Sequence, residues 1–437
     1  MANPSSRLTG QRALLQSSTV SALGDGVRFA ALPLLAVALL DNPFQVTVLT
    51  AAGTAPWLLV ALPAGVYVDR LDRQRVMIYA DLLRCLVLTV AVTLLFTGHL
   101  TFWPLVALAF LLGVGEVLFD CAAQALLPGL VPGEHLERAN GHLYATQTIG
   151  RDLIGQALGG MLFALNRCVP LLVDAVSFLC SALLLRRVPT AGRHSCPPHR
   201  SGHIAREIGE CLRYLLRHRV LLELTAAATL VNTVYMGQLA VLILLVREEL
   251  HLPAALYGVL LTIGALGGVA ASTTASRLTE ALGRRAILTG GLVILALSGL
   301  GIAATRNIYL VAGAYCLSVY AITCWTVIAV SLRQGMVPDR LRGRSTSVDR
   351  LFTWGTNPFG VLAFGAVSQL YGPRASFAAG SVCALAALAV TVSGVRSVPD
   401  RIGARWPPPR EAPADRETRG HLARTADRPY RHGDGNP

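Results

Sequence analysis

Two carboxylic acids stand one helical turn apart in a long apolar stretch of the sequence. Glu116 and Asp120 occur in LLGVGEVLFD, four residues apart, so a helix would place both on one face. When both are ionised they repel each other, and no arginine lies on the same stretch to offset their charge. Such a pair suits the uptake and release of a proton, and both residues are candidates for proton coupling.

Two more charged pairs lie inside apolar stretches. Asp25 and Arg28 are three residues apart, and Arg151 and Asp152 are adjacent. A charged side chain at the centre of a bilayer costs at least about 2.5 kcal/mol, so it usually faces a partner or a water-filled cavity. Asp25 and Asp152 are therefore further proton-coupling candidates, and Arg28 and Arg151 are cavity candidates. The alternative for each pair is a static salt bridge between helices, which needs no functional role.

The composition is that of a membrane protein. Of the 437 residues, 53% are hydrophobic and 14% are charged, whereas charged residues make up about 25% of a soluble domain. A helix needs about 20 mostly apolar residues to cross a bilayer. Such stretches fall at about 14–40, 46–68, 76–97, 101–127, 142–165, 169–186, 220–246, 254–276, 285–304, 307–332, 345–369 and 374–395. They predict an all-α integral membrane fold with 12 transmembrane helices.

Polar side chains are unevenly distributed over these predicted spans. The ninth and twelfth spans are almost purely apolar, whereas the first, fourth, fifth, seventh, tenth and eleventh hold polar or charged residues. Asp81, Arg84 and Asp174 are assigned to structural pairing near the membrane surfaces. The candidates for lining a cavity or contacting a substrate, besides the two arginines, are Gln156, Asn232, Tyr235, Gln238, Trp325 and Asn357.

The chain divides into two similar halves. We expect an N-terminal six-helix half over 1–186, a cytoplasmic linker over 187–219, a C-terminal six-helix half over 220–395 and a disordered cytoplasmic tail over 396–437. LVPGEHLERANG follows the fourth span and MVPDRLRGRSTS follows the tenth, each leading into a glycine-containing span. Two such pseudo-repeats, with a binding site at their interface, are a recurring design of secondary transporters.

The basic residues predict orientation and exclude some chemistry. All 38 are arginines, and they are concentrated in the loops after even-numbered spans. The positive-inside rule places those loops and both termini in the cytoplasm. Without lysine the chain has neither a Walker-type phosphate loop nor a Schiff base. His194, Cys196, His199 and His203 fit a solvated linker better than a metal site, so we expect no cofactor and no metal.

The loop after the second span carries a recognisable motif. It reads Gly65-Val-Tyr-Val-Asp69-Arg70-Leu-Asp72-Arg73, which resembles the G-x-x-x-D-R-x-x-R signature of the major facilitator superfamily. The resemblance extends over nearly all of residues 10–395, and SALGDGVRFAALPLL, LLPGLVP and LVDAVSFL are similar to the macrolide efflux and enterobactin exporter group. It implies that this loop stabilises one conformation of a transport cycle. The alternative is that its arginines only determine topology.

A second motif lies in the fifth span. Gly155, Gly159 and Gly160 resemble the G-P-x-x-G-G antiporter signature of drug exporters, with Gln156 in place of the proline. Small residues at this spacing also pack helices in any membrane protein, which is the alternative role. The fourth span departs from the drug and proton antiporters, because it has acids where they carry an arginine followed by glycine.

These features and the resemblance together imply a secondary transporter. We expect it to export a small amphipathic compound (a drug, antibiotic or secondary metabolite) by proton antiport with alternating access, as a monomer in the bacterial inner membrane. Its partners would be a small-molecule substrate, protons and the lipid bilayer, and no nucleic acid. An importer or facilitator of the same fold is the alternative. A polytopic membrane enzyme is disfavoured because the sequence contains no H-E-x-x-H or G-x-S-x-G motif.

Overall fold

A computed structural model describes residues 4–40, 42–61, 63–64, 68, 71–131, 136–188, 213, 215–216, 218–336 and 352–395, and within these ranges every regular element is helical. In the N-terminal half the helices are α1 (Pro4–Leu39), α2 (Pro43–Thr54), α3 (Pro56–Leu59), α5 (Arg73–Phe96), α6 (Phe102–Leu130), α7 (Leu136–Thr148), η2 (Ile149–Gly155), α8 (Gln156–Leu165) and α9 (Val169–Leu185). In the C-terminal half they are α11 (Arg219–Leu244), η3 (Leu245–Glu249), α12 (Ala254–Leu282), α13 (Arg284–Ala304), α14 (Ile308–Met336), α16 (Asn357–Tyr371) and α17 (Pro373–Val395).

Each of the twelve predicted spans contains helix in the described residues. Eight helices in this part of the chain are long and apolar enough to cross a membrane. The other four predicted spans are shorter or interrupted. The second is divided between α2 and α3 at Pro56, where proline supplies no N–H to continue the helix. The fifth comprises α7, η2 and α8, and its wider π-helical middle is a feature that often occurs at functional sites.

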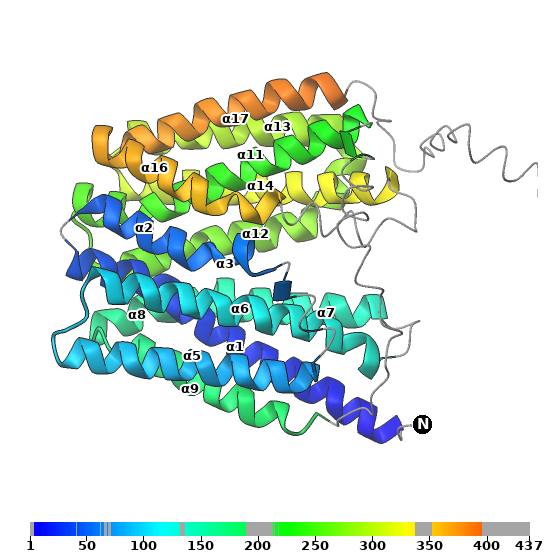
Figure 1. Ribbon diagram of the computed structural model, residues 1–437. Coiled ribbons are helices and arrows are strands. Elements are labelled where there is room, and N and C mark those ends of the chain that lie inside the picture. The colour runs from blue at the N-terminus through cyan, green and yellow to red at the C-terminus, as the bar shows by residue number, and fades with distance from the viewer. Residues whose placement is uncertain are drawn as a thin grey trace, which may run out of the picture.

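The helices form a bundle whose members run along a common direction, as Figure 1 shows. The chain reverses between α1 and α2, α5 and α6, α8 and α9, η3 and α12, α13 and α14, and α16 and α17 at one end of the bundle. We name this the short-turn end. The N-terminus lies at the opposite end, named the N-terminal end.

The helices of each predicted half pack on one another. α1 packs on α9 and α5 on α6 and α9, while α13 packs on α14 and α17 and α12 on α14. In Figure 1 most of the first half lies below and the second half above, with α2 and α3 beside the second half. The domain boundaries remain a prediction, because most of the 187–219 linker and all of the 396–437 tail lie outside the described residues.

The two halves contact each other closely near the short-turn end. α8 packs on α12, where a Cβ atom added to Gly160 would lie 2.8 Å from the Cα atom of Gly258. α2 packs on α16, where a Cβ atom added to Gly365 would lie 2.6 Å from the Cβ atom of Thr47. A glycine on at least one side of each contact allows the helices to approach this closely. The halves are therefore closed against each other at this end.

Candidate functional site

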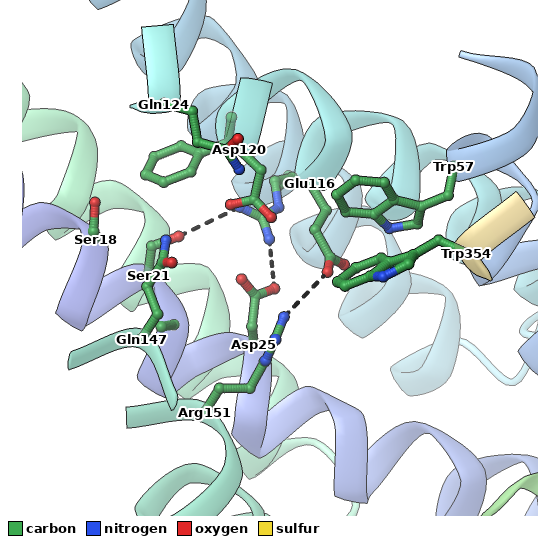
Figure 2. A pocket seen from close by; sticks show the side chains of 13 residues that line it. Ser18, Ser21, Asp25, Trp57, Glu116, Asp120, Gln124, Gln147, Arg151 and Trp354 are labelled. Carbon is green, nitrogen blue, oxygen red and sulfur yellow. Dashed lines mark hydrogen bonds and ion pairs between the residues drawn. The ribbon is translucent and has the colours of Figure 1, made fainter. Parts of the chain in front are cut away.

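A cavity of about 90 Å³ lies among the helices of the first half and reaches the second half (Figure 2). This volume has room for several water molecules, since one water needs about 10–15 Å³. Its floor and walls come mainly from α1, α5, α6 and η2, while Trp57 of α3 and Trp354 close one side. The lining residues are Ser18, Ser21, Ala22, Asp25, Trp57, Arg84, Glu116, Phe119, Asp120, Gln124, Gln147, Arg151 and Trp354.

Arg84 is the most deeply buried cation at the cavity, with a side chain only 1% exposed. It forms an ion pair with Asp25 of α1, and its Nη1 atom lies 3.4 Å from Oδ1 of Asp81. The guanidinium carbon also lies 4.0 Å from the centre of the Phe178 ring, a cation–π contact that supports a desolvated charge. These contacts fix α1, α5 and α9 to one another.

Arg28 links three helices of the first half through carboxylates. Its Nη2 atom lies 2.8 Å from Oδ1 of Asp25 and 3.3 Å from Oε2 of Glu116, and its Nε atom lies 3.4 Å from Oδ2 of Asp174. Glu116 on α6 therefore forms an ion pair with an arginine on α1 that is far away in the sequence. Because a buried charge without a partner is costly, these bonds set how α1, α6 and α9 are rotated.

Arg151 occupies the rim of the cavity on the π-helical segment η2. Its Nη1 atom lies 3.5 Å from Oε1 of Glu116, and its Nε atom lies 3.4 Å from Oδ1 of the neighbouring Asp152. The Arg151 side chain is 33% exposed, in contrast to Arg84. Its ion pairs are therefore accessible to water and easier to exchange.

Asp120 differs from the other cavity acids. It lines the cavity one helical turn from Glu116, yet it forms no ion pair with any residue in the described ranges. Around the cavity six carboxyl groups face three guanidinium groups; the acids are Asp25, Asp81, Glu116, Asp120, Asp152 and Asp174, and the bases are Arg28, Arg84 and Arg151. The surplus of acids favours the binding of protons or of another cation.

The polar candidates of the second half lie elsewhere. Asn232 donates from Nδ2 to the Thr353 carbonyl oxygen at 2.6 Å and to Oδ1 of Asn357 at 2.5 Å, which joins α11 to α16 and to the helical segment 352–355 before it. Gln238 Nε2 is 3.4 Å from the Phe377 carbonyl oxygen. Trp325 is buried among apolar side chains, and Tyr235 packs against the main apolar core. None of the five lines the cavity described above.

The glycine motif of the fifth span lies against α1 and α12. A Cβ atom at Gly155 would lie 2.6 Å from the Leu23 carbonyl oxygen, and one at Gly159 would lie 3.0 Å from the Val27 Cα atom. Gly160 faces α12, as described for the contact between the halves. Gln156, which replaces the proline of the family motif, is buried at the start of α8. Helix packing accounts for all these contacts.

The loop motif is described only in part. Gly65, Asp69 and Arg70 lie outside the described residues. Arg73 is the first residue of α5, and its Nη1 atom donates to the carbonyl oxygen of Ala125 on α6 at 2.8 Å. The preceding Asp72 caps α5, because its side chain accepts hydrogen bonds from the backbone N–H groups of Gln74 and Arg75. Arg73 thus connects this loop to the C-terminal part of α6, the helix that holds Glu116 and Asp120.

Three members of the charge network are paired as expected but lie deeper than the sequence predicts. Structural pairing near the membrane surfaces was expected for Asp81, Arg84 and Asp174, whereas all three are fully buried and Arg84 reaches Asp25 beside the cavity. The sequence contains a signal for this burial, because Arg84 lies halfway along the apolar stretch that forms α5. Trp57 was also missed. No spacing pattern marks it, and its relation to Trp354 arises only where the two halves meet.

Comparisons with known proteins agree with this architecture. Residues 7–422 match the family model described as transmembrane secretion effector. Multidrug efflux pump Tap of Mycolicibacterium fortuitum is 26% identical over 381 residues, covering 84% of this chain and 91% of that protein. Macrolide efflux protein A of Enterococcus faecalis is 28% identical over 189 residues, covering 42% of this chain and 57% of that protein.

Solved structures share the fold. A bacterial homologue of the human lysosomal transporter Spinster, in an inward-facing and occupied conformation, has a TM-score of 0.72 at 15% identity and covers 93% of this chain and 100% of its own. A bacterial homologue of the iron transporter ferroportin, inward-facing, has a TM-score of 0.69 at 19% identity, covering 89% and 98%. With the match to the family model over nearly its whole length, this multi-pass membrane chain belongs to the transmembrane secretion effector family of the major facilitator superfamily.

Proposed function

We propose that this chain exports a small amphipathic compound in exchange for protons. The family and the two relatives named as efflux pumps support an efflux transporter. The observation that most supports proton exchange is the contrast between two neighbouring acids. Glu116 is held by Arg28 and Arg151, whereas Asp120 lines the same cavity without an ion pair in the described part of the chain.

The ion pairs of Glu116 offer a way for a proton to change the structure. Protonation would remove the charge that attracts Arg28 from α1 and Arg151 from η2. Since η2 also packs on α12 of the second half, the release of Arg151 from Glu116 would change the contact between the halves. Asp120 is the first proton acceptor in this scheme and Glu116 the second, with Asp25 and Asp152 as alternatives.

Alternating access would use the two halves as rigid bodies. In the conformation described, the halves are closed at the short-turn end by the Gly160–Gly258 and Thr47–Gly365 contacts. Opening there, with closure at the N-terminal end, would expose the cavity to the other side of the membrane. For export, the N-terminal end would face the cytoplasm and the short-turn end the outside.

This orientation in a bacterial inner membrane has a direct test. Reporter fusions after Arg200 and within the C-terminal tail are expected to score cytoplasmic, and fusions at Asn166 and His251 external. Asn166 and His251 stand in two of the short connections. An external C-terminus would overturn both the orientation and the proposed direction of transport.

Transport itself is tested in two stages. Drug susceptibilities of a pump-deleted bacterial host, with and without this gene, identify a transported compound. A macrolide is the first compound to include, because a relative is named for macrolide efflux. Inverted vesicles loaded with a pH-sensitive dye then report whether that compound releases protons from the vesicle lumen. Compound accumulation inside inverted vesicles indicates export, whereas accumulation only in right-side-out vesicles indicates an importer.

A further inference from the structure

We infer that the cavity binds the positively charged group of an organic cation between the Asp120 carboxylate and the indole rings of Trp57 and Trp354. This inference rests on the proposed function, because it names the substrate class of the same site. Asp120 and both indoles line one cavity, although they come from α6, α3 and the helical segment 352–355 before α16. Figure 2 shows the two indoles on the Glu116 side of the cavity.

The pairing of charges selects against an anion. The lining arginines are both engaged, Arg84 with Asp25 and Asp81, and Arg151 with Glu116 and Asp152. An anionic ligand would have to break one of these pairs and would leave a carboxylate behind without its partner. A cation needs no such exchange, because Asp120 has no ion pair among the described residues.

The aromatic side of the cavity selects an organic cation over a small inorganic one. The Trp57 and Trp354 ring centres are 4.7 Å apart and their planes are inclined by 58°. The Trp354 side is partly open, since that residue is 37% exposed. Indole is the side chain that attracts cations most strongly through its ring face. A quaternary ammonium or phosphonium group also buries apolar substituents against these rings, which a hydrated sodium ion cannot do.

The position of the two indoles would connect binding to conformation. Trp57 belongs to the first half and Trp354 to the second, so a cation that rests against both rings contacts both halves. The present volume of about 90 Å³ is smaller than the about 300 Å³ or more of a drug-sized pocket. A whole compound therefore enters only when the halves separate further, and its charged group then reaches Asp120.

The test uses three molecules of one shape and three charges. The purified full-length protein in detergent is titrated in separate experiments with radiolabelled tetraphenylphosphonium, tetraphenylsilane (neutral) and tetraphenylborate (anionic), because the two ions would pair with each other in a mixture. We expect saturable binding of the phosphonium alone. Saturable binding of the borate with equal or higher affinity, or no saturable binding of the phosphonium, would overturn the inference.

Variants locate the bound cation. Asp120→Asn is expected to weaken binding by about tenfold or more, which corresponds to about 1.4 kcal/mol. Asp120→Glu, which keeps the charge, and Trp354→Phe, which keeps a ring, should retain most of the affinity, whereas Trp354→Leu should lose it. Glu280→Gln is the control, because this acid is exposed on α12 away from the cavity. Gel filtration and thermal unfolding show whether each variant is folded.

The results separate this inference from the proposed function. Binding needs no proton gradient, so cation binding without transport in vesicles would contradict proton-driven export and leave the site assignment standing. Proton-coupled export of neutral or anionic compounds, with no binding of the phosphonium, would contradict the site assignment and leave proton-driven export standing. Unchanged phosphonium affinity in a folded Asp120→Asn protein would place the cation site elsewhere.

Discussion

Arg28 on α1 and Glu116 on α6 lie 3.3 Å apart, between Nη2 and Oε2, although 88 positions separate them in the sequence. Arg28 is also bonded to Asp25 and Asp174, so it links the buried interior of the network to Glu116, which lines the cavity. Arg151, by contrast, reaches Glu116 from the exposed side. Glu116 therefore connects two sets of ion pairs. The buried pairs of Arg28 and Arg84 form the fixed set, and the water-accessible pairs of Arg151 form the exchangeable set.

The fixed set predicts a loss of stability when its central cation is removed. Arg84→Met would leave Asp25 and Asp81 without their buried partner, and breaking a buried ion pair costs about 3–5 kcal/mol. We expect lower abundance in the membrane and a lower temperature of unfolding by fluorescence-detected gel filtration. Arg151→Met, at the exposed rim, is the matched control and should unfold within a few degrees of the wild type. Equal destabilisation by both would contradict the division into two sets.

The loop motif predicts a loss of transport without a loss of protein. Arg73→Ala removes the hydrogen bond to the Ala125 carbonyl oxygen, which ties the start of α5 to the far end of α6. With Asp69→Asn and Gly65→Val, this variant should insert at normal abundance and transport poorly, because the motif favours one conformation and does not contact substrate. Immunoblots of membranes and efflux of the identified compound are the measurements. Arg75→Ala, exposed two residues later, is the control. Normal efflux in all three would leave topology as the only role of the motif.

Closure at the short-turn end predicts the effect of a bulky side chain at Gly160. Gly160→Leu would push α8 away from α12, because even a Cβ atom would meet the Gly258 backbone. We expect the halves to open at that end. The measurement is disulfide cross-linking between Ala51→Cys on α2 and Val361→Cys on α16 in a chain without other cysteines, because these two residues belong to one apolar cluster between the halves, and the cross-linked yield should fall. The control is Gly290→Leu, because a Cβ atom there meets nothing within 4 Å. An unchanged yield with Gly160→Leu would show that this contact does not control closure.

The architecture was more predictable than the site. Twelve apolar stretches, two repeated loop motifs and the loop signature were sufficient for the fold, because each membrane span must satisfy its own backbone hydrogen bonds within a length set by the bilayer. The network was not predictable, since helix rotation decides whether Arg28 and Arg151 turn toward Glu116. The sequence predicted two acids without an arginine on their own helix, and the structure supplies arginines from α1 and η2 to only one of them. The π-helical turn that presents Arg151 has no sequence signal of its own.

That asymmetry between the two acids yields the last prediction. Asp120→Asn should abolish proton exchange, because Asp120 is the acid in the cavity without an ion pair in the described residues. Glu116→Gln should also uncouple transport, for a different reason. It imitates permanent protonation and releases Arg28 and Arg151 together. Both variants should still move the identified compound down its own concentration gradient, although a cationic compound needs a higher concentration with Asp120→Asn because its binding is weaker.

The measurement compares wild type and the two variants in inverted vesicles that contain a pH-sensitive dye. The expected pattern is a compound-induced dye signal in the wild type and none in either variant, with downhill flux of the compound in all three at a saturating concentration. Glu223→Gln is the control, because this acid pairs with Arg219 at the exposed start of α11. If both variants still exchange protons normally, the coupling site lies at Asp25 or Asp152 instead. If the wild type gives no signal for a compound it exports, proton antiport is the wrong mechanism.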